Sequence, residues 1–158
     1  MFDTVIWATD GSEAAERALP FATTLAGAPG TKLIVVHVRE LLGARAGVYP
    51  ARADDDELVD KLEQQADQLR KGGLDASLRV VTSLDANAAH AIADVAMEVG
   101  ANVIVIGTRG RGLVAGLVLG SVTQRLLHVA HCPVLAVPPQ AATAPEEVKQ
   151  LEQVRVPS

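Results

Sequence analysis

The chain has 158 residues, which suits a single domain, and it is 49% hydrophobic but only 3% aromatic, so Val, Ile, Leu and Ala must build its core. The only cysteine, Cys132, excludes an internal disulfide and a cysteine-based metal site, and the net charge of −5 argues against a general nucleic-acid binder. No apolar run approaches the roughly 18 residues of a membrane span, and the first four residues lack the basic start of a signal peptide, so we expect a cytoplasmic protein without membrane contact.

The first part of the chain predicts a strand, a helix and a second strand. Residues 4–8 form a short apolar run rich in β-formers, and residues 9–12 read Thr-Asp-Gly-Ser, which is typical of a turn. Ser12 is a good N-cap, and the apolar residues that follow it recur at helical spacing until residues 28–30 end the helix. Residues 32–38 predict the second strand.

The segment 39–52 predicts a loop, because it contains Gly43, Gly47 and Pro50. It is longer than most connections, so it is either a lid or a variable insertion. Residues 54–56 are three aspartates that open the second helix. We interpret this triplet as solvated charge that complements the helix dipole, in preference to a metal site.

The remaining elements alternate in the same way. Residues 78–82 predict a third strand, and Asp85 or Asn87 caps a third helix. Residues 102–106 predict a fourth, strongly apolar strand. After it come a glycine-rich loop, a fourth helix that begins with the capping-box pattern Ser-Val-Thr-Gln at 121–124, and a fifth strand at residues 133–137.

This alternation predicts an α/β fold with an open five-stranded parallel sheet, right-handed crossovers and helices on both faces. Residues 1–140 form the domain. Residues 141–158 are small, polar and charged, and we expect a mobile C-terminal tail there, with a short helix at residues 145–154 as the alternative.

The stretch from residue 103 to residue 123 carries the chemistry. No Asp or Glu occurs between Glu98 and Glu146, whereas three arginines do, which indicates either a local anion site or simply a buried, charge-poor segment. Glycine at 107 and 110 allows close backbone approach to a ligand and permits positive φ. Residues 120–122 place backbone N–H groups at a helix N-terminus, where phosphate binds well.

Four separate segments resemble the universal stress proteins that bind ATP. They are the glycine spacing Gly107-x2-Gly110-x9-Gly120-Ser121, the turn at residues 8–12, His37-Val38 at the end of the second strand, and residues 131–134 before the fifth strand. The resemblance covers about residues 2–138. It implies the flavodoxin-like strand order 3-2-1-4-5, a nucleotide at the switch point between the first and fourth strands, and a homodimer formed through the fifth strand.

The resemblance also implies which positions hold the nucleotide. They are Ala8, Asp10, Val38, Ile106, Gly107, Arg109, Gly110, Gly120, Ser121, Val122 and Thr123. The first three flank adenine and ribose, the next four contact the ribose and the inner phosphates, and the last four hold the outer phosphates, where Mg²⁺ or Mn²⁺ binds through the phosphates. Asp10 can hold the ribose hydroxyls, or a phosphate-bound metal through water.

The function that the resemblance implies is a dimeric, ATP-binding regulatory module of the stress response, whose protein partner the sequence does not name. We assign no catalytic residue. The alternative is a slow ATPase or self-phosphorylating enzyme that uses the same pocket, although no residue is evident that would orient an attacking water. A related adenine nucleotide, such as a cyclic one, also stays open as the ligand.

Other nucleotide and phosphate proteins fit the sequence less well. A Rossmann loop follows the first strand and needs an acidic residue about 20 positions on, whereas this loop follows the fourth strand. One Trp, one Tyr and two Phe leave little to stack on a flavin. The loop has no lysine for a Walker motif, and residues 138–140 have no lysine for a phosphoacceptor receiver. His128 and His131 lack a third metal ligand nearby.

Overall fold

The computed structural model describes residues 1–44, 47–84, 87–109 and 119–139. Within them the chain forms the following elements: β1 (Thr4–Ala8), α1 (Glu13–Ala26), β2 (Lys32–Ala44), β3 (Gly47–Pro50), α2 (Asp55–Lys71), β4 (Asp75–Leu84), α3 (Ala88–Glu98), β5 (Val103–Gly107), α4 (Ser121–Val129) and β6 (Val134–Val137). None of the helices in these residues is long and apolar enough to cross a membrane. The predicted tail lies outside the described residues.

The parallel strands have the predicted order. β1 pairs with β2 on one side and with β5 on the other. β4 pairs with the side of β2 that faces away from β1, and β6 pairs with β5. Numbered among themselves, these five parallel strands therefore run 3-2-1-4-5. The winding of the chain reverses between β1 and β5, which is the position where ligands bind in open α/β sheets.

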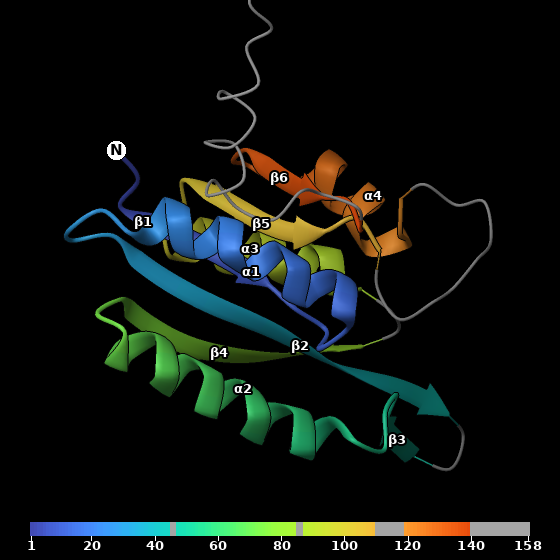
Figure 1. Cartoon of the computed structure of the whole chain (residues 1–158). Coiled ribbons are helices and arrows are strands. Elements are labelled where there is room, and N and C mark those ends of the chain that lie inside the picture. Colours follow the sequence, from blue (N-terminus) through green and yellow to red (C-terminus); the bar gives the residue numbers. More distant parts are fainter. Residues whose placement is uncertain (45–46, 85–86, 110–118, 140–158) are drawn as a thin grey trace, which may run out of the picture.

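Successive residues of the central strands point to opposite faces of the sheet, and each face has its own core. Val5 and Trp7 of β1 pack with α1 and α2 on one face, whereas Ile6 and Ala8 pack with α3 on the other face. Figure 1 shows α1 in front of the sheet and α3 behind it. Helices thus cover both faces, and the strands between them are buried, as the apolar runs predict.

The segment 39–52 is not a loop, which corrects the prediction. β2 continues through Arg39 to Ala44 and pairs antiparallel with β3, so that the sheet has six strands instead of five. Figure 1 shows this hairpin extending β2 away from the body of the domain. Its glycines and its proline do not break the pairing, because the strand here lies at the margin of the sheet and is exposed, where such residues are tolerated.

Two of the predicted helix starts differ in detail. Ser12 caps α1 as expected, since its hydroxyl accepts a hydrogen bond from the Ala15 N–H at 3.2 Å. The capping box at residues 121–124 is wrong, because the N-cap of α4 is Gly120 and Ser121 is already helical. Asn87 is the N-cap of α3 but its side chain makes no capping hydrogen bond, and Asp85 lies outside the described residues.

Candidate functional site

A cavity of about 490 Å³ lies at the carboxyl ends of β1 and β5, beside the middle of β2 and next to the N-terminus of α4. Its volume falls within the range of small-molecule sites, roughly 300–1,000 Å³. The cavity brings together nine of the residues that the sequence predicts for the site: Ala8, Asp10, Val38, Ile106, Gly107, Arg109, Gly120, Ser121 and Val122. Gly110 lies outside the described residues. The remaining predicted residue is Thr123.

Thr123 lies behind the cavity wall. Its side chain is buried, and its hydroxyl donates a hydrogen bond to the Gly107 carbonyl oxygen at 2.9 Å. This bond ties the first turn of α4 to the end of β5. The geometry therefore gives the Thr123 side chain a structural role, and contact of this residue with phosphate stays a prediction.

Gly107 is required by packing between β5 and α1. A Cβ atom at this position would lie 2.6 Å from the Ala14 carbonyl oxygen and 2.8 Å from its carbonyl carbon, closer than real Cβ contacts come. Its φ is not positive, unlike that of Gly11 at 74°. Close approach of a ligand to this glycine, which lines the cavity, stays a prediction, and the structure adds the close approach of the α1 backbone.

The turn after β1 fixes the orientation of Asp10. The Asp10 Oδ1 atom accepts a hydrogen bond from the Ser12 N–H at 2.9 Å, and the Gly11 N–H donates to the Thr9 hydroxyl at 3.1 Å. A Cβ on Gly11 would meet the Leu58 side chain at 2.4 Å, so the turn packs tightly against α2. Asp10 is thereby held at the cavity, which the N-terminus of α4 also lines.

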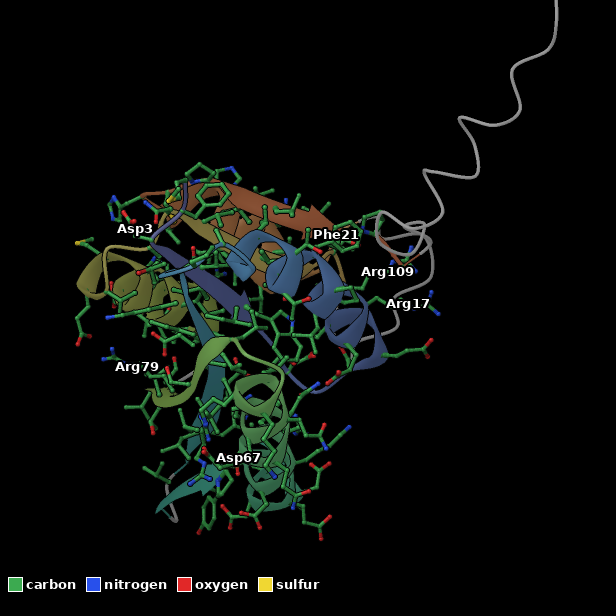
Figure 2. All side chains as sticks on the ribbon, turned by 60° about the vertical axis from the view of Figure 1, so that its left-hand side comes forward. Asp3, Arg17, Phe21, Asp67, Arg79 and Arg109 are labelled. Carbon is green, nitrogen blue, oxygen red and sulfur yellow. The ribbon has the colours of Figure 1, made fainter. Side chains whose placement is uncertain are left out.

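The N-terminus of α4 lines the cavity next to the end of β5. Gly120 is extended, with φ −69° and ψ 156°, and its N–H donates to the Thr108 carbonyl oxygen at 2.6 Å. Ser121 and Val122 are the first residues of the helix, and N–H groups there have no acceptor within the helix. Arg109 adds an exposed guanidinium at the same end of the molecule, where Figure 2 shows it near Arg17.

A buried charge cluster that was not predicted from the sequence lies beside the cavity. His37 lines the cavity with its side chain fully buried, and its Nε2 atom lies 2.9 Å from Asp55 Oδ1. The other oxygen of Asp55 accepts a hydrogen bond from Arg39 Nε at 2.6 Å, and Arg39 also pairs with Asp56 at 2.7 Å. Burial raises the pKa of Asp55, but the hydrogen bonds from His37 and Arg39 outweigh it and bring the pKa below the ordinary carboxyl value.

Two sequence interpretations are corrected by this cluster. Asp55 is only 5% exposed, so it does not belong to a solvated acidic triplet. His37 is not merely a strand-end residue, since it joins β2 to the first turn of α2. The spacing of His37 and Arg39 was the available signal, because alternate residues of a strand point to the same face and these two face an acidic helix start.

Arg52 closes the same wall of the cavity. Its Nη1 atom donates to the Asp10 carbonyl oxygen at 2.8 Å, and its Nε and Nη2 atoms each lie 3.1 Å from the carboxylate of Asp54. Arg52 thus attaches the segment after β3 to the turn after β1. Among the described residues, no group of three or more His, Cys, Asp or Glu side chains is arranged to hold a metal ion.

Comparison with known proteins agrees with this architecture. The family model for the universal stress protein family matches residues 1–138. A universal stress protein from Thermus aquaticus is 36% identical over 142 residues, covering 87% of this chain and 99% of that protein.

Two solved structures carry nucleotides. A universal stress protein in complex with cAMP shares 28% identity, with a TM-score of 0.63 over 86% of this chain and 97% of that one. A universal stress protein from Archaeoglobus fulgidus in complex with dAMP shares 27% identity, with a TM-score of 0.61 over 87% of this chain and 98% of that one. On the evidence of the family match and of the relative from Thermus aquaticus, the chain belongs to the universal stress protein family.

Proposed function

We propose that this chain is an adenine-nucleotide-binding module whose principal ligand is ATP. The observation that carries the proposal is that Asp10, Arg109 and the N-terminus of α4 line one cavity at the switch point of the sheet. The complexes of related universal stress proteins with cAMP and dAMP support an adenine nucleotide as the ligand class.

The two ends of the cavity differ in chemistry, as a nucleotide requires. Val38, Ala88 and Ile92 provide an apolar wall suited to the adenine ring. The opposite end offers the backbone N–H groups of Ser121 and Val122, which suit phosphate oxygens because the helix dipole places partial positive charge there. Asp10 lies between them, where its carboxylate suits the ribose hydroxyls. A Mg²⁺ or Mn²⁺ ion would reach this site through the phosphates.

Calorimetric titration with ATP tests the proposal, with two arginine variants as a matched pair. Arg109→Ala removes a guanidinium at the phosphate end, and we expect roughly tenfold weaker binding, the value of one charge-assisted hydrogen bond. Arg79→Ala is the control, because Arg79 pairs with Glu98 and lies on the other side of the molecule in Figure 2. Mass spectrometry of small molecules released on denaturation identifies any nucleotide that copurifies.

Folded protein that binds no adenine nucleotide would overturn the proposal, as would equal losses in the two variants. The same samples separate a binding module from an enzyme. Intact ATP after hours of incubation supports the binding module. Release of ADP, or a mass increase of one phosphate that Ser121→Ala abolishes, would support the slow ATPase or self-phosphorylating alternative, because the Ser121 side chain lies at the cavity.

We further propose that the module is a homodimer that pairs through β6 and that nucleotide sets its affinity for a protein partner. In the described part of the chain, β6 pairs only with β5, and Leu135 on it is 38% exposed. An unpaired strand edge with an exposed leucine favours pairing with a second copy. Light scattering that gives a dimer mass, reduced to the monomer mass by Leu135→Lys, is the expected result, and a monomeric wild type would refute it.

A further inference from the structure

His37 has hydrogen-bond acceptors at both of its ring nitrogens. Its Nδ1 atom lies 3.0 Å from the Thr9 carbonyl oxygen, and its Nε2 atom lies 2.9 Å from Asp55 Oδ1. A neutral imidazole carries one N–H, so it satisfies only one of these acceptors and turns a lone pair toward the other. The imidazolium donates to both. The buried geometry therefore fits the protonated form of His37.

The charges around the ring favour the same form. Asp55 is fixed as a carboxylate because Arg39 occupies its second oxygen, and the lowered pKa of Asp55 agrees with this. Among the other charged residues that line the cavity or begin α2, carboxylates outnumber guanidinium groups: Asp10, Glu40, Asp54, Asp56 and Glu57 against Arg39, Arg52 and Arg109. From β4 the paired residue is Val80, and from α3 the nearby cavity residues are Ala88 and Ile92, none of which is ionisable.

The protonated ring joins three elements at the ribose side of the cavity. One N–H holds the carbonyl of Thr9, the residue immediately before Asp10, and the other holds the first turn of α2. Loss of the proton breaks one of these bonds in a site that water does not reach. Either the turn that carries Asp10 or the start of α2 is then released.

We propose that His37 is a positioning residue that holds the ribose side of the nucleotide pocket in its binding conformation only while the imidazole is protonated. Nucleotide affinity is therefore higher when the ring is charged than when it is neutral, and it falls with rising pH. This coupling rests on the proposed nucleotide binding, whereas the charged state of His37 does not.

Three variants separate the charge from the packing. His37→Gln retains an N–H donor for Asp55, and His37→Asn retains one for Thr9, but neither side chain titrates. Asp55→Asn leaves the histidine in place and gives Nε2 an amide donor, so a neutral imidazole then satisfies both contacts. The other histidines, His90, His128 and His131, are unchanged in all three variants, and their contributions to any pH dependence cancel.

The experiment combines nitrogen NMR of the imidazole without nucleotide and ATP calorimetry across pH. The His37 signal is identified as the one that is absent from His37→Gln. In the wild type at about pH 7, we expect this signal to show both ring nitrogens protonated. We expect the ATP affinity of the wild type to fall about fivefold between about pH 6 and about pH 8.5. The titration of ATP itself contributes equally to the wild type and to every variant. The quantity compared is therefore how much more steeply ATP affinity falls with pH in the wild type than in a variant. We expect His37→Gln and Asp55→Asn to lack this additional fall.

A neutral His37 at about pH 7 would overturn the proposal, and so would a slope in His37→Gln or Asp55→Asn equal to that of the wild type. Absence of ATP binding at every pH would overturn the proposed function and the affinity coupling together. The NMR signature would still decide, in that case, whether the buried ring carries the charge. The two failures are therefore distinguishable.

Discussion

Replacement of Gly107 by alanine is the sharpest test of how the fold positions the cavity. The added Cβ would lie 2.6 Å from the Ala14 carbonyl oxygen and 3.1 Å from the Ala15 nitrogen, and both are backbone atoms of α1. Ordinary van der Waals contact begins near 3.4 Å, so α1 must withdraw by roughly 0.8 Å. No side-chain rotation can relieve this overlap.

The expected cost follows from what that movement disturbs. The indole N–H of Trp7, which is fully buried, donates to the Ala15 carbonyl oxygen at 3.0 Å, so a shift of α1 lengthens a buried hydrogen bond. Overpacking of this kind costs about 1–3 kcal/mol. For a domain of this size, where 1 kcal/mol shifts the melting temperature by about 2–4 °C, we therefore expect Gly107→Ala to lower it by about 2–12 °C. ATP affinity should also fall, because the turn at Asp10 begins α1.

Gly27→Ala is the matched control for thermal and urea unfolding. Gly27 also contacts the backbone of α1, but its nearest atoms lie at 3.4 Å and its φ of −71° suits any residue. We expect this variant to be neutral or up to about 1 kcal/mol more stable, since alanine restricts the unfolded chain. If Gly107→Ala unfolds at the same temperature as Gly27→Ala, the packing argument for residue 107 is refuted.

Three further predictions address the charge cluster, the helix start and the thiol. Because His37 and Arg39 lower the pKa of Asp55 despite its burial, their stabilisation is complete above the ordinary carboxyl pKa and is lost as the pH falls through the lowered one. The urea midpoint of the wild type should therefore fall more steeply below about pH 4 than that of Asp55→Asn, and parallel curves would contradict this. Ser121→Ala should change the free energy of unfolding by less than about 0.5 kcal/mol, because the N-cap of α4 is a glycine; a loss of about 1 kcal/mol in urea unfolding would indicate a capping hydroxyl. Burial raises the pKa of the Cys132 thiol, so alkylation near neutral pH should be slower in folded than in urea-unfolded protein, and equal rates would contradict the burial.

The elements that the sequence predicted well are those whose signal is local. The buried strands β1 and β5 stand out as short apolar runs between turn residues, and the helices α1 and α2 show apolar residues at helical spacing. Such patterns depend only on neighbouring residues and on which side of the element is buried. The alternation of strands and helices then left few topologies to consider.

The β2–β3 hairpin could not be predicted in this way. Gly43 and Pro50 indicate a break in local terms, but the strand persists because Leu41 pairs with Leu84 of β4 and with Pro50 of β3. Pro50 lies within the same segment, but Leu84 lies 43 positions away, and nothing in residues 39–52 specifies it as a partner. Strand formation in this region therefore depends in part on pairing with a distant segment.

The residues of the candidate site also differ in whether a local sequence signal predicts them. The residues around the N-terminus of α4 were found because the glycine spacing lies in one continuous segment. The cluster of His37, Arg39 and Asp55 was missed because its members become neighbours only when α2 packs beside β2. A buried aspartate and an exposed one look identical in a sequence, and only the burial of Asp55 shows that its charge has partners.

The cavity itself follows from the unequal lengths of neighbouring strands. β1 ends at Ala8, whose register partner is Val36, while β2 continues for eight more residues to Ala44. The chain leaves the sheet there because Gly11 adopts φ 74° and packs directly against Leu58. Beyond Val36, the edge of β2 that faced β1 has no strand partner among the described residues until Leu41, where β3 pairs with it. The space left between is bounded by β2, the end of β5 and the N-terminus of α4. His37 and Arg39 of the buried charge cluster lie in this interval of β2, so the contacts that join the long strand to α2 also shape the wall of the pocket.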